Sequence, residues 1–242
     1  MKTLHQLREE AIASTIQAVK ESVGQDDLII QSIRSILDLT RAGNILVKRL
    51  RDWYAFHNPE FENACPDHQK FVETILAKPK KELLQELKVS HSMGKDLAKE
   101  DLESMLNLAR SVKDLFELIK KQEAYLEQAM KLVCPNIQAV AGTLIGARLL
   151  DLAGSLRRLA MLPSSTIQLL GAEKALFRHI VTGAKSPKHG ILILHPLVAQ
   201  SKTKGRAARL VADKICMAAR IDYFKGGFIG EKLKKELEEK LA

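Results

Sequence analysis

Two stretches of this 242-residue chain repeat apolar residues at alternating spacings of four and three, and this pattern constrains the fold more than any other feature. A period of 3.5 residues, sustained over about four heptads, indicates a long helix that packs along another helix in a coiled coil. At about 1.5 Å per residue, the helices over residues 28–56 and 102–133 would be roughly 43 and 48 Å long. The sequence therefore predicts an all-α protein built on a long coiled coil. The repeat positions are Ile29, Ile33, Ile36, Thr40, Gly43, Val47, Leu50 and Tyr54, then Leu102, Met105, Ala109, Val112, Phe116, Ile119, Glu123, Leu126, Met130 and Val133.

The segment between the two stretches, near residues 57–100, contains several helix breakers. Pro59, Pro66, Pro79 and Gly94 each interrupt a helical pattern. Such breakers favour short helices, which can form a tip that returns the chain to its starting end. We therefore expect the two long helices to form an antiparallel hairpin with a helical tip.

Apolar residues also flank the second repeat, so its apolar stripe is wider than one neighbouring helix requires. We expect residues 28–135 to form a coiled-coil domain that pairs two copies of the chain. Alternatively, the tip and an N-terminal helix over residues 1–27, expected to pack near the C-terminal domain, cover this stripe. The flanking residues are Leu106, Leu108, Leu115, Leu118 and Leu132. The residues expected to carry homodimerisation are Ile33, Ile36, Val47, Leu50, Val112, Phe116, Ile119 and Leu126.

Residues 136–242 are predicted to form a separate helical domain. Pro135 ends the second long helix, because proline disfavours helical backbone in the residue before it. An apolar helix is expected over residues 137–160, in which Gly142 and Gly146 allow neighbouring helices to pack closely. Further helices are expected from Gly171 to a point before Gly183, near residues 205–221 and over residues 230–242.

The net charge of +9 is confined to this second part of the chain. Residues 1–147 contain 20 basic and 21 acidic residues, a balance of −1, whereas residues 148–242 contain 18 basic and 8 acidic residues, a balance of +10. Neutralisation of phosphates by Lys and Arg dominates nucleic-acid affinity. The asymmetry therefore predicts a polyanionic partner for the C-terminal domain; the alternative is a basic surface that serves only solubility.

Several classes of protein are disfavoured. Cys65, Cys134 and Cys216 lie far apart, which fits reduced thiols better than a disulfide framework or a zinc site. No apolar run approaches the roughly 18 residues that a membrane-spanning helix needs, and the first residues do not resemble a secretion signal. No nucleophile stands with a base, and no phosphate-binding glycine loop is present. The sequence predicts neither an enzyme nor a protein with a metal or cofactor.

Several motifs, in a fixed order, closely resemble the signature of the Nop domain. Upstream, residues 51–60 resemble the first coiled-coil helix of that family, so the resemblance covers nearly the whole chain. The motifs are RDWYAFHNPE at 51–60, SSTIQ at 164–168, GAEKALFRHI at 171–180, PKHG at 187–190, HPLV at 195–198 and AARIDYF at 218–224.

This resemblance implies a coiled coil that pairs two copies and a helical domain that binds a kink-turn RNA together with a ribosomal-protein-like partner. The chain would then be a scaffold of a box C/D guide ribonucleoprotein, which directs RNA 2'-O-methylation. Fibrillarin is an expected partner only if the natural protein has an N-terminal domain that is absent here, since this sequence begins just before the coiled coil. Alternatives are a splicing-type Nop protein that binds a spliceosomal kink-turn, and a coiled-coil adaptor without RNA contact. The expected location is the cytoplasm of an archaeon, or the nucleolus or nucleus of a eukaryote.

Candidate RNA-binding residues fall in three segments. A glycine before a helix lets its free N–H groups approach an anion, and Lys174 and Arg178 would share the outer face of that helix, with Ala175, Leu176 and Ile180 toward the core. Pro187 stiffens a basic loop in which His189 could stack on an unpaired base. The candidates are Gly171, Ala172, Glu173, Lys174, Arg178 and His179, then Lys185, Lys188 and His189, then Lys202, Lys204, Arg206 and Arg209.

Two of these candidates have alternative roles. Glu173 is expected to order its loop through backbone N–H groups rather than to contact RNA. Arg206 and Arg209 are expected to contact phosphates, but Arg209 could instead pair with Asp213 one helical turn away.

Overall fold

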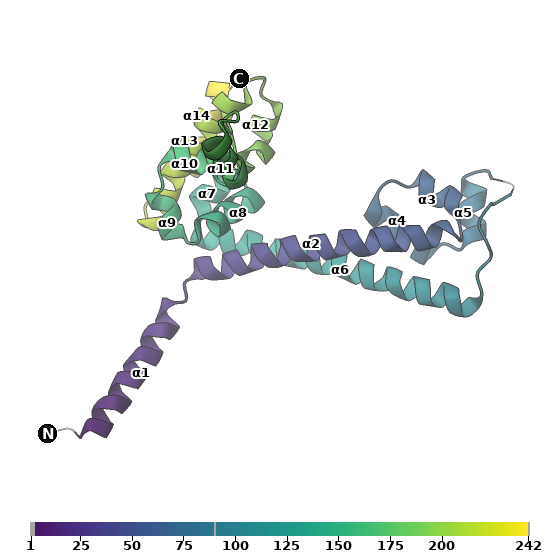
Figure 1. Cartoon of the computed structure of the whole chain (residues 1–242), viewed down its shortest axis with the longest axis horizontal. Coiled ribbons are helices and arrows are strands. Elements are labelled where there is room, and N and C mark those ends of the chain that lie inside the picture. Colours follow the sequence, from purple (N-terminus) through teal and green to yellow (C-terminus); the bar gives the residue numbers. More distant parts are fainter. Residues whose placement is uncertain (1–2, 90, 242) are drawn as a thin grey trace. The chain divides into compact units, whose positions relative to one another are not determined.

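The computed structural model describes residues 3–89 and 91–241, and every regular element in these ranges is helical (Figure 1). The all-α fold predicted from the sequence is confirmed. Residues Ser35–Ala124 form one unit, the hairpin unit. The described residues up to Arg34, together with those from Tyr125 onwards, form a second unit, the bundle unit. The helices in chain order are α1 (Leu4–Ser22), α2 (Gln25–Ala55), α3 (Pro59–Ala64), α4 (His68–Ala77), α5 (Lys80–Glu86), α6 (Lys99–Val133), α7 (Pro135–Ala141), α8 (Thr143–Ala153), α9 (Leu156–Met161), α10 (Ser164–Leu169), α11 (Glu173–Thr182), the 3-10 helix η1 (Ile191–Leu194), α12 (Pro196–Gln200), α13 (Lys204–Tyr223) and α14 (Gly230–Leu241).

The two heptad stretches become the long helices α2 and α6. Gly43 lies opposite Phe116: a Cβ atom added to the glycine would lie 3.7 Å from the Phe116 ring. Further toward the tip, residues 47–54 of α2 share one apolar cluster with residues 105–112 of α6. The pairing runs forward along one helix and backward along the other, as an antiparallel hairpin requires.

Six of the eight residues proposed for homodimerisation are buried within this single chain, which corrects the expectation for those positions. Leu50, Val112 and Leu126 are fully buried, and Phe116 and Ile119 are half-buried. A side chain that is buried within one chain is not available to a second copy. The buried repeat positions therefore describe packing inside the chain, whereas the half-buried Phe116 and Ile119 stay candidates for contact with a second copy. The remaining proposed positions, which are also buried, are Ile33, Ile36 and Val47.

An aromatic cluster holds the helical tip against the end of α2. The ring of Phe71 in α4 is fully buried, stacks on Phe61 with ring centroids 5.8 Å apart, and meets Tyr54 edge to face at 5.4 Å. Burial raises the pKa of Tyr54 to about 12, because it withdraws the hydroxyl from water. Because the three aromatic rings come from α2, α3 and α4, the tip packs as one body with the end of the hairpin.

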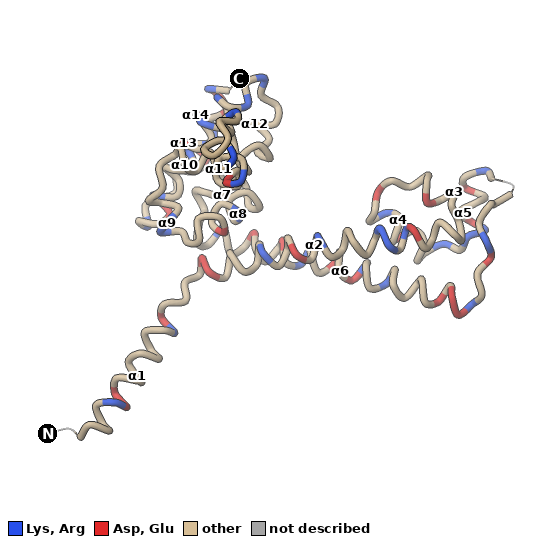
Figure 2. The backbone as a smooth tube through the Cα atoms, viewed as in Figure 1, with Lys and Arg blue, Asp and Glu red and all other residues tan. Residues whose placement is uncertain are grey.

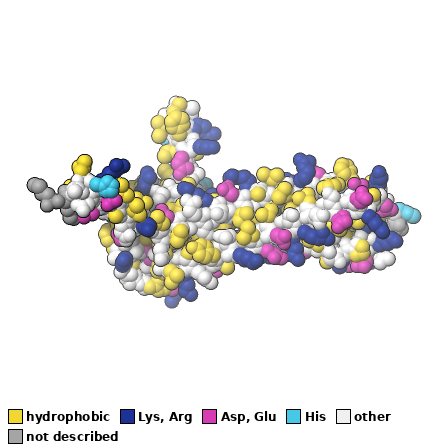
Figure 3. Space-filling view, turned by 90° about the horizontal axis from the view of Figure 1, so that it is seen from below, with side chains coloured by type: hydrophobic (Ala, Val, Ile, Leu, Met, Phe, Trp, Pro, Cys, Tyr) yellow, Lys and Arg dark blue, Asp and Glu magenta, His cyan; other side chains and the backbone are white. Residues whose placement is uncertain are grey.

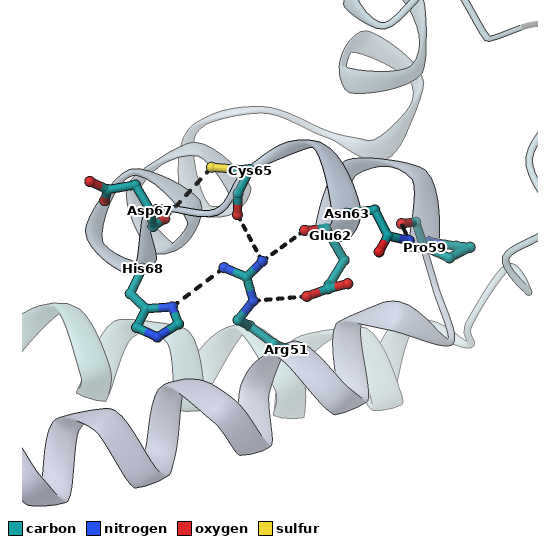
Figure 4. A network of polar contacts seen from close by, with 7 residues as sticks. All are labelled: Arg51, Pro59, Glu62, Asn63, Cys65, Asp67 and His68. Atoms are coloured by element: carbon teal, nitrogen blue, oxygen red, sulfur yellow. Dashed lines mark hydrogen bonds and ion pairs between the residues drawn. The ribbon is translucent and has the colours of Figure 1, made fainter.

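Arg51 adds a polar anchor beside this cluster, drawn in Figure 4. Its Nε donates to Glu62 Oε1 at 2.8 Å, and its Nη2 donates to the carbonyl oxygens of Glu62 and Cys65, both at 2.8 Å. The guanidinium also lies 4.7 Å from the centre of the Phe71 ring. Such a cation, largely withdrawn from water, is stable only with satisfied donors. Arg51 and Tyr54, two residues of the motif at 51–60, therefore stabilise the tip.

In the bundle unit, α13 is the central helix, and α7, α9, α10, α12 and α14 pack around it. The single helix predicted over residues 137–160 is wrong. Gly142 and Gly154 adopt left-handed φ values of +78° and +88°, and these divide the segment into α7, α8 and α9. Gly146 allows close packing as expected, since an added Cβ would lie 2.8 Å from the Met130 side chain.

A buried polar cluster joins three segments of the bundle unit. The Asp222 carboxylate, at the end of α13, accepts hydrogen bonds from Asn136 N, Asn136 Nδ2 and Ile137 N at 3.1, 2.7 and 2.9 Å. The Asn136 side-chain oxygen accepts from Ile229 N at 2.8 Å. Burial raises the pKa of the Asp222 carboxyl, although its donors oppose that shift. The cluster fixes the start of α7 against both ends of the loop between α13 and α14.

Helix α1 has no buried residue, so the expected packing of residues 1–27 near the C-terminal domain stays a prediction. Its N-terminus carries a reciprocal cap between Thr3 and Gln6. The start of α2 is held within the bundle unit, where Asp26 accepts from Leu156 N at 2.8 Å and Arg34 pairs with Asp151 at 2.6 Å. No helix in the described ranges combines the length and apolar character needed to cross a membrane.

Candidate nucleic-acid interface

A groove of about 920 Å³ opens on the bundle unit between α10, the loop before η1 and the first turns of α13. Cationic and hydrogen-bonding side chains surround it. Its lining residues are Ser165, Gln168, Leu169, Ser186, Pro187, Lys188, His189, Lys202, Thr203, Lys204, Gly205, Arg206 and Arg209. Three segments that are distant in sequence therefore converge on one concave, basic surface.

The loop over residues 184–190 is fixed against α10 by one side-chain and one backbone hydrogen bond. Gln168 donates from Nε2 to the Lys188 carbonyl at 2.6 Å, and Gly190 N donates to the Gln168 carbonyl at 2.8 Å. A Cβ atom at Gly190 would lie 1.9 Å from the Leu170 carbonyl oxygen, so only glycine fits there. With Pro187 limiting the backbone as well, the loop presents Lys188 and His189 in a largely preformed arrangement.

The cations of the groove have no acidic partners. Among the described residues, none of them forms an ion pair with a carboxylate. In particular, the alternative pairing of Arg209 with Asp213 is not formed. Figure 2 marks the Lys, Arg, Asp and Glu residues along the backbone. Like charges gathered without counter-charges repel one another, and a bound polyanion would relieve that repulsion. These cations are Lys188, Lys202, Lys204, Arg206 and Arg209.

The turn before α11 is ordered as the sequence indicated. Glu173 Oε1 accepts a hydrogen bond from Gly171 N at 2.6 Å. Gly171 has a φ of +86°, and an added Cβ would lie 2.4 Å from Ile191 Cγ2, so both backbone angle and space require glycine. Glu173 thus shapes the turn. The turn and α11 do not contribute to the groove lining.

The core face predicted for α11 is wrong. Ile180 is 72% exposed, and Ala175 and Leu176 are only half-buried. Phe177 and Val181, which the sequence analysis did not single out, are also exposed, so α11 carries an uncovered apolar surface beside its basic residues. The sequence does contain a sign of this wide apolar surface: two pairs of adjacent apolar residues, at 176–177 and 180–181, lie four residues apart. A stripe that wide on a ten-residue helix exceeds what a single core contact covers.

The structure therefore divides the thirteen candidate residues into two groups. Those in the groove are Lys188, His189, Lys202, Lys204, Arg206 and Arg209. Those outside its lining are Gly171, Ala172, Glu173, Lys174, Arg178, His179 and Lys185. Sequence reasoning missed the polar lining residues Ser165, Gln168, Ser186 and Thr203. Hydroxyl and amide groups of this kind commonly bond phosphate and sugar oxygens, but no sequence pattern distinguishes them from ordinary surface residues.

Comparisons with known proteins identify relatives for nearly the whole chain. Residues 35–242 match the sequence model of a family described as "Nop: snoRNA binding domain, fibrillarin". An uncharacterised NOP5 family protein from Methanocaldococcus jannaschii is 38% identical over 98% of this chain and 62% of its own length. Nucleolar protein 56 from Homo sapiens is 35% identical over 90% of this chain and 41% of its own length. The chain thus spans only part of these longer relatives.

A solved structure resembles the fold. A chain in the crystal structure of a fibrillarin/Nop5p complex matches with a TM-score of 0.60 at 24% sequence identity, and the match covers 97% of the present chain and 76% of the chain in the complex. At this level of identity the match supports the helical architecture. It carries no information about what the groove binds, which depends on the residues that line it.

Proposed function

The chain belongs to the Nop family, and from this premise we propose that it is an RNA-binding scaffold of a box C/D guide ribonucleoprotein. In this proposal it recognises a kink-turn RNA that already carries a ribosomal-protein-like partner, and it pairs two such assemblies in a particle for RNA 2'-O-methylation. The observation that carries the proposal is the groove, which is lined by His189 and by five cations that form no ion pair with a described carboxylate. A coiled-coil adaptor without RNA contact would have no use for this groove.

The groove suits a folded RNA in two ways. Its Lys and Arg residues can neutralise phosphates, which supplies affinity without sequence preference. His189, half-buried on a fixed loop, can stack on a base that has left its pair, and a kink offers such a base. The phosphate contacts would supply affinity for any RNA, and stacking of a base on His189 would favour an RNA that has an unpaired base at a kink.

The exposed surface of α11 suits the protein partner. Phe177 is 69% exposed and lies on the same short helix as Ile180, Val181 and the basic residue Arg178. Exposed aromatic and aliphatic side chains beside an arginine are typical of the centre of a protein–protein interface. We therefore assign the groove to RNA and α11 to the partner that the RNA carries.

This assignment predicts a shape-specific effect of His189→Ala. The variant should lose roughly 5- to 150-fold in affinity for the kink-turn RNA with its bound partner, because one stacked base is lost. Its affinity for an unstructured RNA of equal length should hardly change. Fluorescence polarisation with both ligands measures the difference. An equal loss on both RNAs would leave only a generic basic surface and would contradict the proposal.

Homodimerisation through the hairpin is part of the same proposal. Apolar side chains remain exposed along the hairpin, the long right-hand part of the view in Figure 3. Ile45 on α2 is 62% exposed and borders a shallow groove with Leu37, and Leu118 on α6 is also exposed. These residues, rather than the buried repeat positions, are available to a second copy.

Light scattering of the purified chain should give about twice the mass of one chain. Ile45→Asp should shift the protein toward a monomer without unfolding it, because this side chain is largely exposed. Met161→Asp, a change at an exposed residue of α9 in the bundle unit, serves as the control and should leave the dimer intact. A wild-type monomer at every concentration tested would rule out the dimer.

Membership of the Nop family also suggests a further protein partner, an alternative RNA and a location in the cell, each under a stated condition. Fibrillarin is a proposed partner only for a natural protein that carries the N-terminal domain implied by the family resemblance. A splicing-type role would use the same groove on a spliceosomal kink-turn. In a eukaryote, such a scaffold would act in the nucleolus, as the name of the human relative indicates for that protein; in an archaeon it would act in the cytoplasm.

A further inference from the structure

Helix α13 and Phe224, the residue after its end, carry one stripe of exposed or half-buried side chains beside a largely buried face. The residues of this stripe follow one another at spacings of three or four, so they lie on one face of the helix. Over 18 residues the stripe extends roughly 27 Å from the groove to the far end of the helix. Its members are Arg206, Arg209, Asp213, Met217, Arg220 and Phe224.

The stripe is basic beyond the groove as well as within it. Arg220 donates from Nε to the Ala160 carbonyl at 3.2 Å, which fixes its stem against α9. Its other nitrogens have no partner among the described residues, and the residue is exposed. Asp213 is the one carboxylate of the stripe and is half-buried. A polyanion leaving the groove would therefore meet a further free cation along this face.

An exposed aromatic ring stands at the far end of the stripe. Phe224 is 67% exposed and meets Tyr223 edge to face with ring centroids 5.0 Å apart. The loop that follows is held at both ends, since Gly226 N donates to the Ile221 carbonyl at 2.8 Å and Ile229 N donates to Asn136 Oδ1 at 2.8 Å. A large apolar ring kept in water on an ordered loop is poised for a flat apolar ligand.

We propose that an unpaired RNA segment leaves the groove along this stripe, with a phosphate at Arg220 and a base stacked on Phe224. Three observations favour RNA as the occupant: the stripe is continuous with the proposed RNA groove, its cations outnumber its single carboxylate, and it ends in an exposed aromatic ring. Aromatic platforms beside cations are a common way to bind single strands. The inference rests on the proposed function, because it extends the path of the same RNA.

The test uses the full chain and a kink-turn RNA with its bound partner. The RNA is either blunt or extended by about eight unpaired nucleotides, first at one end and then at the other. This length lies within the usual range of single-strand binding sites. An extension should raise the affinity of the wild-type protein by on the order of 10-fold. Phe224→Ala should abolish this gain and keep the affinity for the blunt RNA. Phe224→Tyr, which preserves a stacking ring, should retain the gain.

Phe56→Ala is the matched control, because Phe56 is 70% exposed and belongs to the hairpin unit. It should leave the gain unchanged. If the wild-type protein binds blunt and extended RNAs equally, or if Phe224→Ala behaves like Phe56→Ala, the inference is overturned while the proposed function stands. The latter result would assign the exposed ring to something other than RNA, such as a protein. If the wild-type protein binds neither RNA, the proposed function itself fails.

Discussion

Reversing the charge of Arg206 and Arg209 together, as R206E and R209E, is expected to reduce the affinity for RNA by on the order of 100-fold or more. Both side chains line the groove without an acidic partner in the described part of the chain, so the change removes two phosphate contacts and adds two repulsive ones. The corresponding double alanine variant should flatten the plot of log affinity against log salt by up to about two units, because fewer counterions are released. Fluorescence polarisation at four salt concentrations measures both quantities.

The control for this experiment reverses the charges of Lys120 and Lys121, which are exposed on α6 in the hairpin unit. It changes the net charge of the chain by the same amount. If the control variant loses as much affinity as the groove variant, RNA binding depends on overall charge and not on the groove.

Replacing Phe71 by Ala should lower the free energy of unfolding of the hairpin unit by roughly 3–5 kcal/mol. The ring is fully buried, stacks on Phe61, meets Tyr54 edge to face and supports the Arg51 guanidinium. Its removal would leave a cavity among three helices and would weaken the anchor that ties the tip to α2. Urea denaturation followed by circular dichroism, with each unit's transition fitted separately, measures the loss.

The same variant tests the division of labour between the two units. RNA binding by Phe71→Ala should stay close to wild type under conditions where the bundle unit is folded, since the groove lies wholly in that unit. Phe56→Ala, which changes an exposed ring, should alter stability by less than about 0.5 kcal/mol. A loss of RNA affinity that parallels the loss of hairpin stability would show that the groove depends on the hairpin.

The long helices could be predicted from sequence because their heptads are local and periodic. The break-up of residues 137–160 could not, since a glycine within an apolar run fits both a close helix contact and a left-handed turn. Gly146 takes the first role, whereas Gly142 and Gly154 take the second. Neighbouring segments decide between the two roles, and those contacts are not visible in a local pattern.

The basic half of the site could also be predicted from sequence. Lys188, Arg206 and Arg209 were identified from charge and spacing, and the structure brings them to one groove. Two assignments needed three-dimensional contacts. The apolar face of α11 faces solvent although its pattern resembles a core face, and the buried heptad positions serve the hairpin rather than a dimer. Periodicity reveals that a face is apolar but does not identify what covers it.

We propose that this chain recognises a kink-turn RNA and its bound protein as one composite surface. The most direct measurement is a titration of the wild-type chain against three ligands: the kink-turn RNA with its ribosomal-protein-like partner, the same RNA alone, and a straight duplex of equal length and charge. We expect the chain to bind the composite at least on the order of 100-fold more tightly than the duplex at physiological salt, with the affinity for the RNA alone in between. Equal affinity for all three ligands would contradict it.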